Sequence, residues 1–252
     1  MAAAYIPPHE EAIQLEKRNS TRAAALDKLP SWYNPYLHLA VPSAFGIAVI
    51  VTAIAMLKDV AWWQLLAVPI TWIITNANEW RIHRDLLHRR FAPAAILYDR
   101  HTPEHHMIYI TDDMAMRDRR EFGLVLIPAY GLFLIFVTLL PVTSLLWILL
   151  SRNVALLYLA TAMGFTVSYE WLHLSYHLPQ DSWIGQLWLV RVLRRHHAIH
   201  HDPRLMQRYN FNVTVPLWDW VRGTMITDRA QVLGAQPAQN LPNAQMPSPG
   251  LR

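Results

Sequence analysis

Four long apolar stretches limit what this chain can fold into. They cover residues 36–57, 60–77, 123–150 and 154–174, and their interiors contain almost no charged side chains. A helix that crosses a bilayer core needs about 20 consecutive, predominantly apolar residues. The whole chain is 53% hydrophobic and only 16% charged, whereas an ordinary soluble domain has about 25% charged residues. We therefore expect an all-α integral membrane protein with four transmembrane helices.

The connectors between these stretches predict how the helices pair. Only Lys58 and Asp59 separate the first two stretches, and residues 151–153 separate the last two. Connectors this short join antiparallel neighbours, so we expect two helical hairpins. The third stretch contains Pro128 and Pro141, which predicts either one kinked span or a span with a shorter re-entrant piece.

Positive charge is concentrated on one side of this predicted topology. Of the 22 Lys and Arg residues, only Lys58 and Arg152 fall in the two short connectors. The others lie in the N-terminal segment, in residues 79–122 and after residue 175. Because Lys and Arg are enriched in cytoplasmic loops, we place both termini and the segment 79–122 in the cytoplasm. The membrane is then a bacterial inner membrane or the endoplasmic reticulum.

The chain divides into three predicted regions. Residues 1–35 form an N-terminal cytoplasmic or interfacial segment, residues 36–228 a catalytic membrane domain, and residues 229–252 a tail. Within the first region, residues 10–29 are either an amphipathic helix on the membrane surface or a solvated extension. The tail is rich in Pro, Gln and Asn and has no apolar period, which predicts disorder. The absence of cysteine excludes disulfides, thiolate metal sites and cysteine nucleophiles.

Ten of the 13 histidines form four clusters on the predicted cytoplasmic side. The clusters are His83 with His88, His101 with His105 and His106, His173 with His177, and His197 with His200 and His201. On an α-helix, side chains three or four residues apart share one face. The pairs predicted from this spacing are His173 with His177, His101 with His105, and His197 with both His200 and His201.

Two positions do not fit the simple helical spacing. His83 and His88 are five residues apart, so we expect the helix to end or bend at one of them. His196 directly precedes the fourth cluster and competes with His197 for the role of ligand, and we prefer His197.

The histidine clusters predict a site for two metal ions. Imidazole binds Fe, Zn, Cu and Ni, and ten ligands are too many for one ion but suit two ions with five each. We expect one ion to take mainly His83 and His88 with part of the second and fourth clusters. The other ion then takes His173 and His177 with the remainder. Glu170 lies one turn before His173 and is expected to orient that ligand. This dimetal site would lie in a cytoplasmic helical cap.

The ordered set H-x4-H, H-x3-HH, H-x3-H and H-x2-HH on four spans resembles the fatty acid hydroxylase/sterol desaturase superfamily of integral-membrane oxygenases. The closing segment 210–224, NFNVTVPLWDWVRGT, is similar to the family's tail, in which an Asn-aromatic-Gly-Val-Thr run precedes Trp-Asp and Gly-Thr. The resemblance covers residues 79–224. Asn212 stands where the family commonly has Gly, and we expect Asn to keep a left-handed turn there. The second box is H-x3-HH, whereas several members have H-x2-HH.

The resemblance implies a dinuclear iron centre that activates O2 and hydroxylates an unactivated C–H bond of a fatty acyl or sterol-like lipid. All ten clustered histidines would then be metal-binding and catalytic residues. Zinc competes for imidazole and is expected in some purified samples. The chain lacks the His-Pro-Gly-Gly stretch of a fused cytochrome b5 domain. Electrons are therefore expected from a separate ferredoxin or cytochrome b5 with its reductase, and no nucleic-acid partner is expected.

Three other interpretations compete with a lipid hydroxylase. A lipid or sterol desaturase would use the same site. A divalent-metal transporter or a bis-histidine haem protein belongs to a different class. A transporter places ionisable residues at the bilayer midplane, but residues 36–57, 60–75 and 123–150 contain no Asp, Glu, Lys or Arg in their interiors. A zinc protein without redox chemistry is the third.

Four arginines lie near the first box. They are either positive membrane anchors or contacts for an anionic head group: Arg81, Arg84, Arg89 and Arg90.

Overall fold

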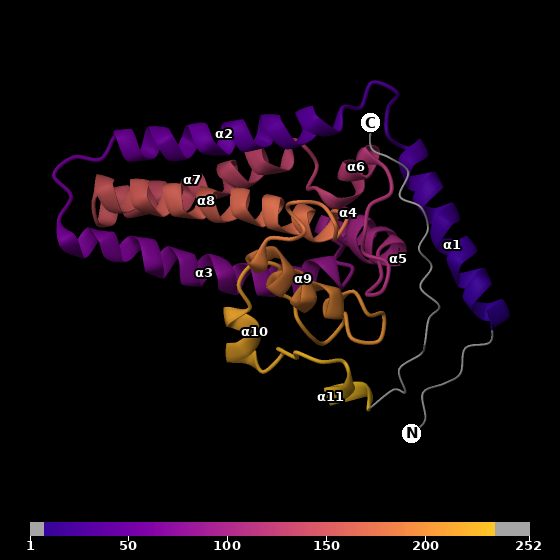
Figure 1. The fold of residues 1–252 in the computed structure, drawn as a ribbon. Helices are drawn as coiled ribbons and strands as arrows, with labels where there is room; N and C mark the ends of the chain where they lie inside the picture. The colour runs from indigo at the N-terminus through magenta and orange to yellow at the C-terminus, as the bar shows by residue number, and fades with distance from the viewer. Residues whose placement is uncertain (1–7, 235–252) are drawn as a thin grey trace.

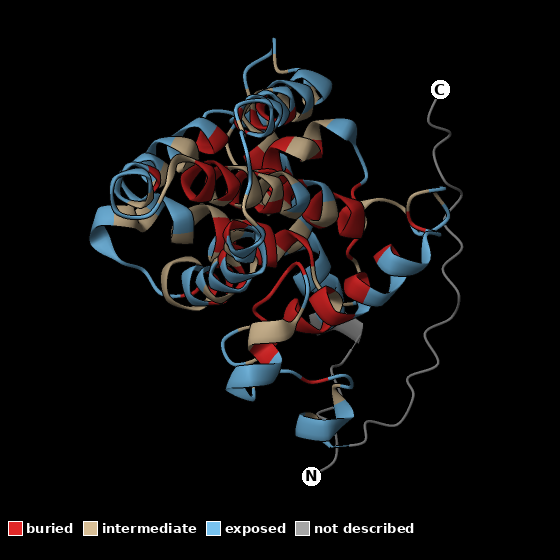
Figure 2. Cartoon of the chain, turned by 90° about the vertical axis from the view of Figure 1, so that its left-hand side faces the viewer, coloured by how far each residue is buried: buried red, intermediate tan, exposed pale blue. Residues whose placement is uncertain are grey.

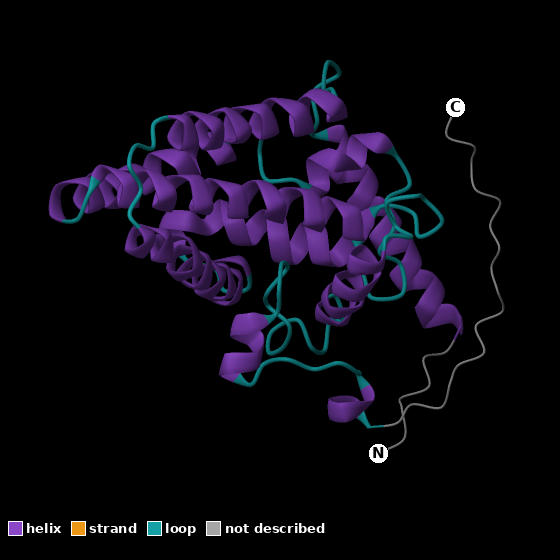
Figure 3. Cartoon of the chain, turned by 60° about the vertical axis from the view of Figure 1, so that its left-hand side comes forward, coloured by secondary structure: helices purple, strands orange, loops and turns teal. Residues whose placement is uncertain are grey.

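The computed structural model describes residues 8–234, which form helices joined by turns and contain no β-strand (Figures 1 and 3). The all-α prediction is confirmed for these residues. The longer helices are α1 (Pro8–Asp27), α2 (Pro35–Ala55), α3 (Ala67–Ile82), α7 (Gly131–Leu149), α8 (Arg152–His177) and α9 (Trp188–His200). The shorter α-helices are α4 (Ala95–Arg100), α5 (His106–Ile108), α6 (Phe122–Val125), α10 (Leu217–Arg222) and α11 (Ala230–Leu233).

Tighter and wider helical turns connect these helices. The 3₁₀ turns are η1 (Trp62–Leu66), η3 (Ala92–Ala94) and η5 (Arg119–Glu121). The π turns are η2 (His83–Leu87) and η4 (His101–His105), and both begin at a histidine.

Helix α8 is the centre of a four-helix bundle. It packs against α2, α7 and α3, and the four helices run side by side (Figure 1). Buried residues follow α8 through the bundle, while the outer helices are largely exposed (Figure 2). At Gly46 the backbone of α2 approaches α8 so closely that a Cβ atom would lie 2.5 Å from Val167 Cγ2. A small residue at such a crossing is typical of helix packing in membranes.

The two connectors meet at the end of the bundle that lies away from the histidines. Asn153 Nδ2 donates to the carbonyl of Lys58 at 2.7 Å and to Gln64 Oε1 at 3.0 Å. Gln64 Nε2 in turn donates to Ser151 Oγ at 2.9 Å. Because these polar groups satisfy one another, both predicted hairpins are tied together at their tips.

Two of the four predicted spans meet the criteria for a membrane-crossing helix. Helices α2 and α7 are long and apolar enough by length and composition, and their apolar windows are only 22% and 11% buried. The second stretch is split, since residues 62–66 form η1 and α3 has only 16 residues. Helix α8 is long enough, but it is largely buried and ends in polar residues. The four-span topology therefore stays a proposal.

The third apolar stretch is interrupted rather than continuous. Helix α6 ends at Val125, residue 126 is extended, and α7 begins only at Gly131. Pro128 lies in this break and cannot donate a helical hydrogen bond. Pro141, in contrast, remains inside α7. The alternative of a span with a shorter piece describes this segment better than one kinked helix.

The terminal regions differ in part from their predicted states. For residues 10–29 we expected either an amphipathic helix or a solvated extension. The structure has α1 there, which packs on α5 and α6 through Arg22 and Ala25, 5% and 2% exposed. At the other end, α11 forms inside the region predicted to be disordered. Residues 235–252 of that predicted tail lie outside the described residues.

Replacing Asn153 with Ala tests the link between the connectors. The substitution leaves the carbonyl of Lys58 without its partner, which costs about 1–3 kcal/mol, and removes one of the two donors to Gln64 Oε1, which keeps the backbone N–H of Ala61. We expect a lower midpoint of thermal unfolding in detergent. Asn78→Ala is the control, because Asn78 is exposed and such positions change stability by about 0.5 kcal/mol at most. Equal midpoints for the two variants would contradict this account.

Candidate metal centre

The ten clustered histidines converge at one end of the bundle, where they form two groups of five. The first group is His83, His88, His101, His106 and His200, and the second is His105, His173, His177, His197 and His201. Within each group the ligand atoms all lie within 4.8 Å of one another. No member is more than 9% exposed. The expected division into two sets of five is the division that the fold produces.

The two π turns explain which histidines share the first group. The backbone N–H of His88 donates to the carbonyl of His83, and that of His106 donates to the carbonyl of His101. Hydrogen bonds between residues five apart widen the helix, so side chains with H-x4-H spacing face the same way. The predicted pairing of His101 with His105 is therefore wrong, since it assumed α-helical geometry.

The α-helical spacing holds where the helix is regular. His173 and His177 of α8 lie together in the second group, as predicted. His197 and His201, also four residues apart, join them there. The predicted pairing of His197 with His200 is wrong, because His200 leaves α9 on another flank and reaches the first group.

His196 has a different partner and does not enter either group. Its Nε2 lies 3.1 Å from Asp219 Oδ2 in a buried contact. The preference for His197 over His196 as the candidate ligand agrees with this geometry.

Backbone carbonyls accept from the outer nitrogen of five of these ten rings. The Nδ1–H groups donate from His105 to Leu124 (3.2 Å), His177 to Met114 (2.9 Å), His200 to Tyr209 (2.9 Å) and His201 to Tyr109 (2.6 Å). His83 donates to the carbonyl of Phe211 in the same way. For His88 the acceptor is Thr102 Oγ1, whose own hydroxyl donates to the carbonyl of Leu87. Such outer contacts fix the orientation and tautomer of a metal-binding histidine.

In the rings whose Nδ1–H has an acceptor, the inner nitrogen carries no proton to share with its neighbours. His88 Nε2 and His200 Nε2 lie 2.9 Å apart, but both rings carry their proton on Nδ1. In the second group, the Nε2 atoms of His105, His173 and His177 are buried without any hydrogen-bond partner. Because buried polar atoms are normally paired, converging lone pairs of this kind form an arrangement that a bound cation would satisfy. The donor set therefore fits a metal ion in each group.

Burial keeps these imidazoles neutral, which is the form that binds metal. It lowers the pKa of His83 to about 4 and, together with the neighbouring imidazole of His83, that of His88 to about 2. Burial also holds the pKa of a further six rings well below the usual range, with other imidazoles adding to the effect: His101, His105, His106, His197, His200 and His201. At neutral pH the site presents unprotonated ligands.

Two buried carboxylates hold the loop that positions His83. Asp219 accepts the backbone N–H groups of Phe211 at 2.9 Å and Asn212 at 2.7 Å. Glu79 of α3 accepts those of Val213 at 2.6 Å and Thr214 at 2.9 Å. The carbonyl of Phe211, which orients His83, is thus fixed from both sides.

Asn212 does not adopt the left-handed turn that we expected at this position. Among the described non-glycine residues, only Asp59 and Asn210 have a positive φ. The side chain of Asn212 instead donates to the carbonyl of Asn76 at 3.0 Å and to Glu79 Oε2 at 3.1 Å. Its amide is therefore part of the loop's attachment to α3.

Glu170 does not orient His173 as predicted. Its carboxylate accepts the backbone N–H of Ile127 at 3.4 Å, which ties α8 to the break between α6 and α7. None of the hydrogen bonds among the described residues joins it to His173.

Tyr109 connects α1 to the second histidine group. Its carbonyl accepts from His201, and its ring lies 4.7 Å from that of His177 between centroids. Its hydroxyl donates to Glu121 at 2.6 Å, and Arg22 Nε of α1 lies 3.4 Å from the same carboxylate. The N-terminal helix therefore supports the site through a buried chain of contacts.

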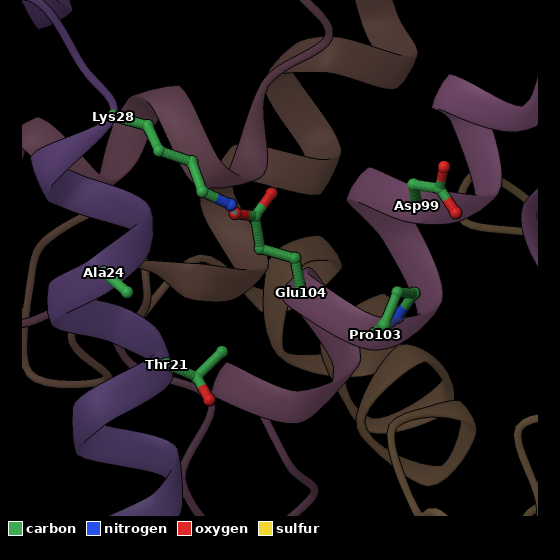
Figure 4. A pocket seen from close by; sticks show the side chains of 6 residues that line it. All are labelled: Thr21, Ala24, Lys28, Asp99, Pro103 and Glu104. Atoms are coloured by element: carbon green, nitrogen blue, oxygen red, sulfur yellow. Dashed lines mark hydrogen bonds and ion pairs between the residues drawn. The ribbon is translucent and has the colours of Figure 1, made fainter.

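A small pocket of about 350 Å³ marks the second contact between α1 and the site (Figure 4). Lys28 Nζ lies 3.0 Å from Glu104 Oε1 of η4, the π turn that carries His101 and His105. Since Lys28 is exposed, this ion pair contributes only about 1 kcal/mol or less. The two charges neutralise each other, and we assign no ligand to this pocket.

Sequence reasoning identified the ten candidate ligands but missed the groups that hold them. The Trp-Asp pair of the closing segment pointed to Asp219 only as part of a motif. Glu79 follows the second apolar stretch by two residues, and nothing in the sequence indicated the partner of its carboxylate. Thr102 and Tyr109 carried no recognisable pattern.

The fold and the site define a helical protein with a buried, histidine-lined centre that could hold two metal ions. A family model described as fatty acid hydroxylase matches residues 68–224, more than half of the chain, so the chain belongs to this family. Searches among curated proteins and among solved structures find no match. Family membership and the histidine groups together indicate an oxidoreductase of the lipid hydroxylase or desaturase type, associated with a membrane.

Asp219→Asn tests the support of the first group. An amide donates where one carboxylate oxygen accepted, so the N–H of Phe211 or Asn212 loses its acceptor and His83 loses its fixed orientation. Affinity for metal in the first group should fall roughly 10–100-fold, as for other partners of metal-binding histidines. Metal titration of the purified protein measures this. Asp112→Asn is the matched control, since Asp112 forms an exposed ion pair with Arg229, and an equal loss in both variants would contradict the assignment.

The low pKa values predict how the metal-free protein responds to acid. The unfolded chain takes up protons below its histidine pKa of about 6.5, while the folded chain does not, so acid favours unfolding. Each extra proton bound on unfolding lowers the free energy of unfolding by about 1.4 kcal/mol per pH unit. We expect the unfolding midpoint to fall between pH values of about 6.5 and about 5. A midpoint that stays constant over this interval would show that the rings are not held neutral.

Proposed function

We propose that this protein is an O2-dependent, non-haem di-iron membrane enzyme that hydroxylates an unactivated C–H bond of a lipid. The observation that carries the proposal is the pair of adjacent all-histidine groups with converging Nε2 atoms. Oxidation of a C–H bond needs a redox metal, and zinc has no redox chemistry. Imidazole suits iron, and bound iron would supply the one-electron and O2 chemistry.

In this proposal all ten histidines are metal ligands. His83, His88, His101, His106 and His200 would hold one ion, and His105, His173, His177, His197 and His201 would hold the other. Neither group contains a carboxylate. The rings of His106 and His201 stack with centroids 4.2 Å apart, so the two groups share a boundary. The protein's part is to fix these rings and to keep bulk water away from them.

The arrangement in the membrane is part of the proposal. Helices α2, α3 and α7 expose many apolar side chains, as lipid-facing helices do, including Ile47, Ile74 and Leu145. We propose that these helices cross the bilayer with α8 and that the histidines and both termini lie on the cytoplasmic side. A lipid substrate could then reach the site from the bilayer. Electrons would come from a separate ferredoxin or cytochrome b5 with its reductase.

Alanine variants in both groups test the ligand assignment. We expect His88→Ala, His106→Ala, His177→Ala and His200→Ala to abolish turnover and to lower bound iron while the protein stays folded in detergent. The control is His38→Gln, because His38 contacts Tyr33 and Ile127 outside the two groups. Full activity in two of the four alanine variants would contradict the assignment.

The proposed reaction is tested with protein expressed in iron-supplemented cells. We expect two irons per chain, a Mössbauer spectrum of non-haem iron, and host lipids that have gained one oxygen atom. Lipids that have instead lost two hydrogen atoms would identify a desaturase. A Soret band with one haem per chain, or folded protein that binds no metal, would overturn the proposal.

A further inference from the structure

A basic pocket lies beside the second histidine group. It has a volume of about 430 Å³ and lies between α9, residues 111–114 and residues 180–186. Three arginines of α9 line it: Arg191, Arg194 and Arg195. Arg194 and Arg195 follow Arg191 by three and four residues, so all three side chains share one face of α9.

These arginines lack the acidic partners that other arginines near the site have. Arg84 and Arg89 pair with Asp85, and Arg90 pairs with Asp99. Among the described residues, no carboxylate lies within 4.0 Å of the guanidinium groups of the three pocket arginines. We considered an anionic head group for the arginines near the first box. The three pocket arginines suit such a group better, because no carboxylate already neutralises them.

The pocket keeps an excess of positive charge. Asp112 is the carboxylate that lines it, and this side chain is paired with Arg229 at 3.3 Å. Arg194 is only 8% exposed, and its Nη1 donates to the carbonyl of Leu178 at 2.9 Å. A guanidinium held in this way is oriented in advance for a carboxylate or a phosphate.

An exposed apolar strip borders the arginines. On α9, Trp188 is 70% and Val192 47% exposed, and each lies three residues before a pocket arginine. Trp183 in the preceding segment is 76% exposed. A helix with Trp and aliphatic residues beside Arg is typical of the membrane–water interface. The anion that fits this position is therefore the head group of an amphiphile.

The pocket also adjoins the proposed ligands. Met114 lines it, and the carbonyl of Met114 orients His177. Leu178, held by Arg194, follows His177 directly, and Ala198 of the lining follows His197. A head group bound here would therefore lie beside residues that directly follow His177 and His197 in the sequence.

We infer that Arg191, Arg194 and Arg195 form a binding site for the carboxylate or phosphate head group of a lipid. This site would anchor the substrate and favour anionic over uncharged amphiphiles, a role that rests on the proposed function.

Binding to the purified protein in a non-ionic detergent, without a reductant, tests the site without relying on turnover. The probes are palmitate, hexadecyl phosphate and hexadecanol, which share one chain length and differ in the head group. We expect at least one anionic probe to bind about tenfold more tightly than hexadecanol, which corresponds to about 1.4 kcal/mol. The double variant Arg191→Gln/Arg195→Gln should remove this preference and leave hexadecanol binding unchanged. Whether carboxylate or phosphate binds more tightly identifies the head group.

Arg208→Gln is the matched control, because Arg208 is exposed and does not line the pocket. The inference is overturned if all three probes bind equally, or if Arg208→Gln weakens anion binding as much as the double variant. Inorganic phosphate binding as tightly as hexadecyl phosphate would also overturn it, since the site would then recognise a soluble anion. Selective lipid binding by a protein that binds no iron would leave this site standing and remove the proposed function.

Discussion

The structure depends on the convergence of unprotonated imidazole nitrogens in a buried space. Lone pairs that face one another at about 3 Å repel, and water is excluded from their surroundings. The folded chain brings them together because the outer nitrogens of five rings donate to backbone carbonyls and that of His88 donates to Thr102. A cation in each group would convert this repulsion into bonding, so metal binding and folding are expected to be coupled.

The rest of the fold serves to hold those outer contacts in place. The loop 210–214 presents the carbonyl that orients His83, and Asp219 and Glu79 fix that loop by accepting its backbone N–H groups. On the other side, Arg22, Glu121 and Tyr109 link α1 to the carbonyl that orients His201. Buried carboxylates thus act on the candidate metal centre through the backbone, not as members of the histidine groups.

Part of this could be predicted from the sequence, for identifiable physical reasons. Apolar stretches and the four histidine boxes indicated the helices, the ten candidate ligands and the family. Spacing alone failed where the helix was not an α-helix, since the π turns at His83 and His101 change which side chains share a face. Partners distant in sequence, such as Asp219 and Glu79, depend on loop geometry that no local pattern encodes. The expectation for Asn212 failed because a buried amide found partners on α3.

X-ray absorption at the iron edge tests the central claim most directly. Iron-loaded protein, purified in detergent, should show iron bound by nitrogen and oxygen, with the multiple scattering of about five imidazoles per iron and two irons per chain. His177→Ala should reduce both the iron content and the imidazole contribution. A spectrum with only one or two imidazoles per iron, or a single iron per chain, would contradict a centre built from two groups of five histidines.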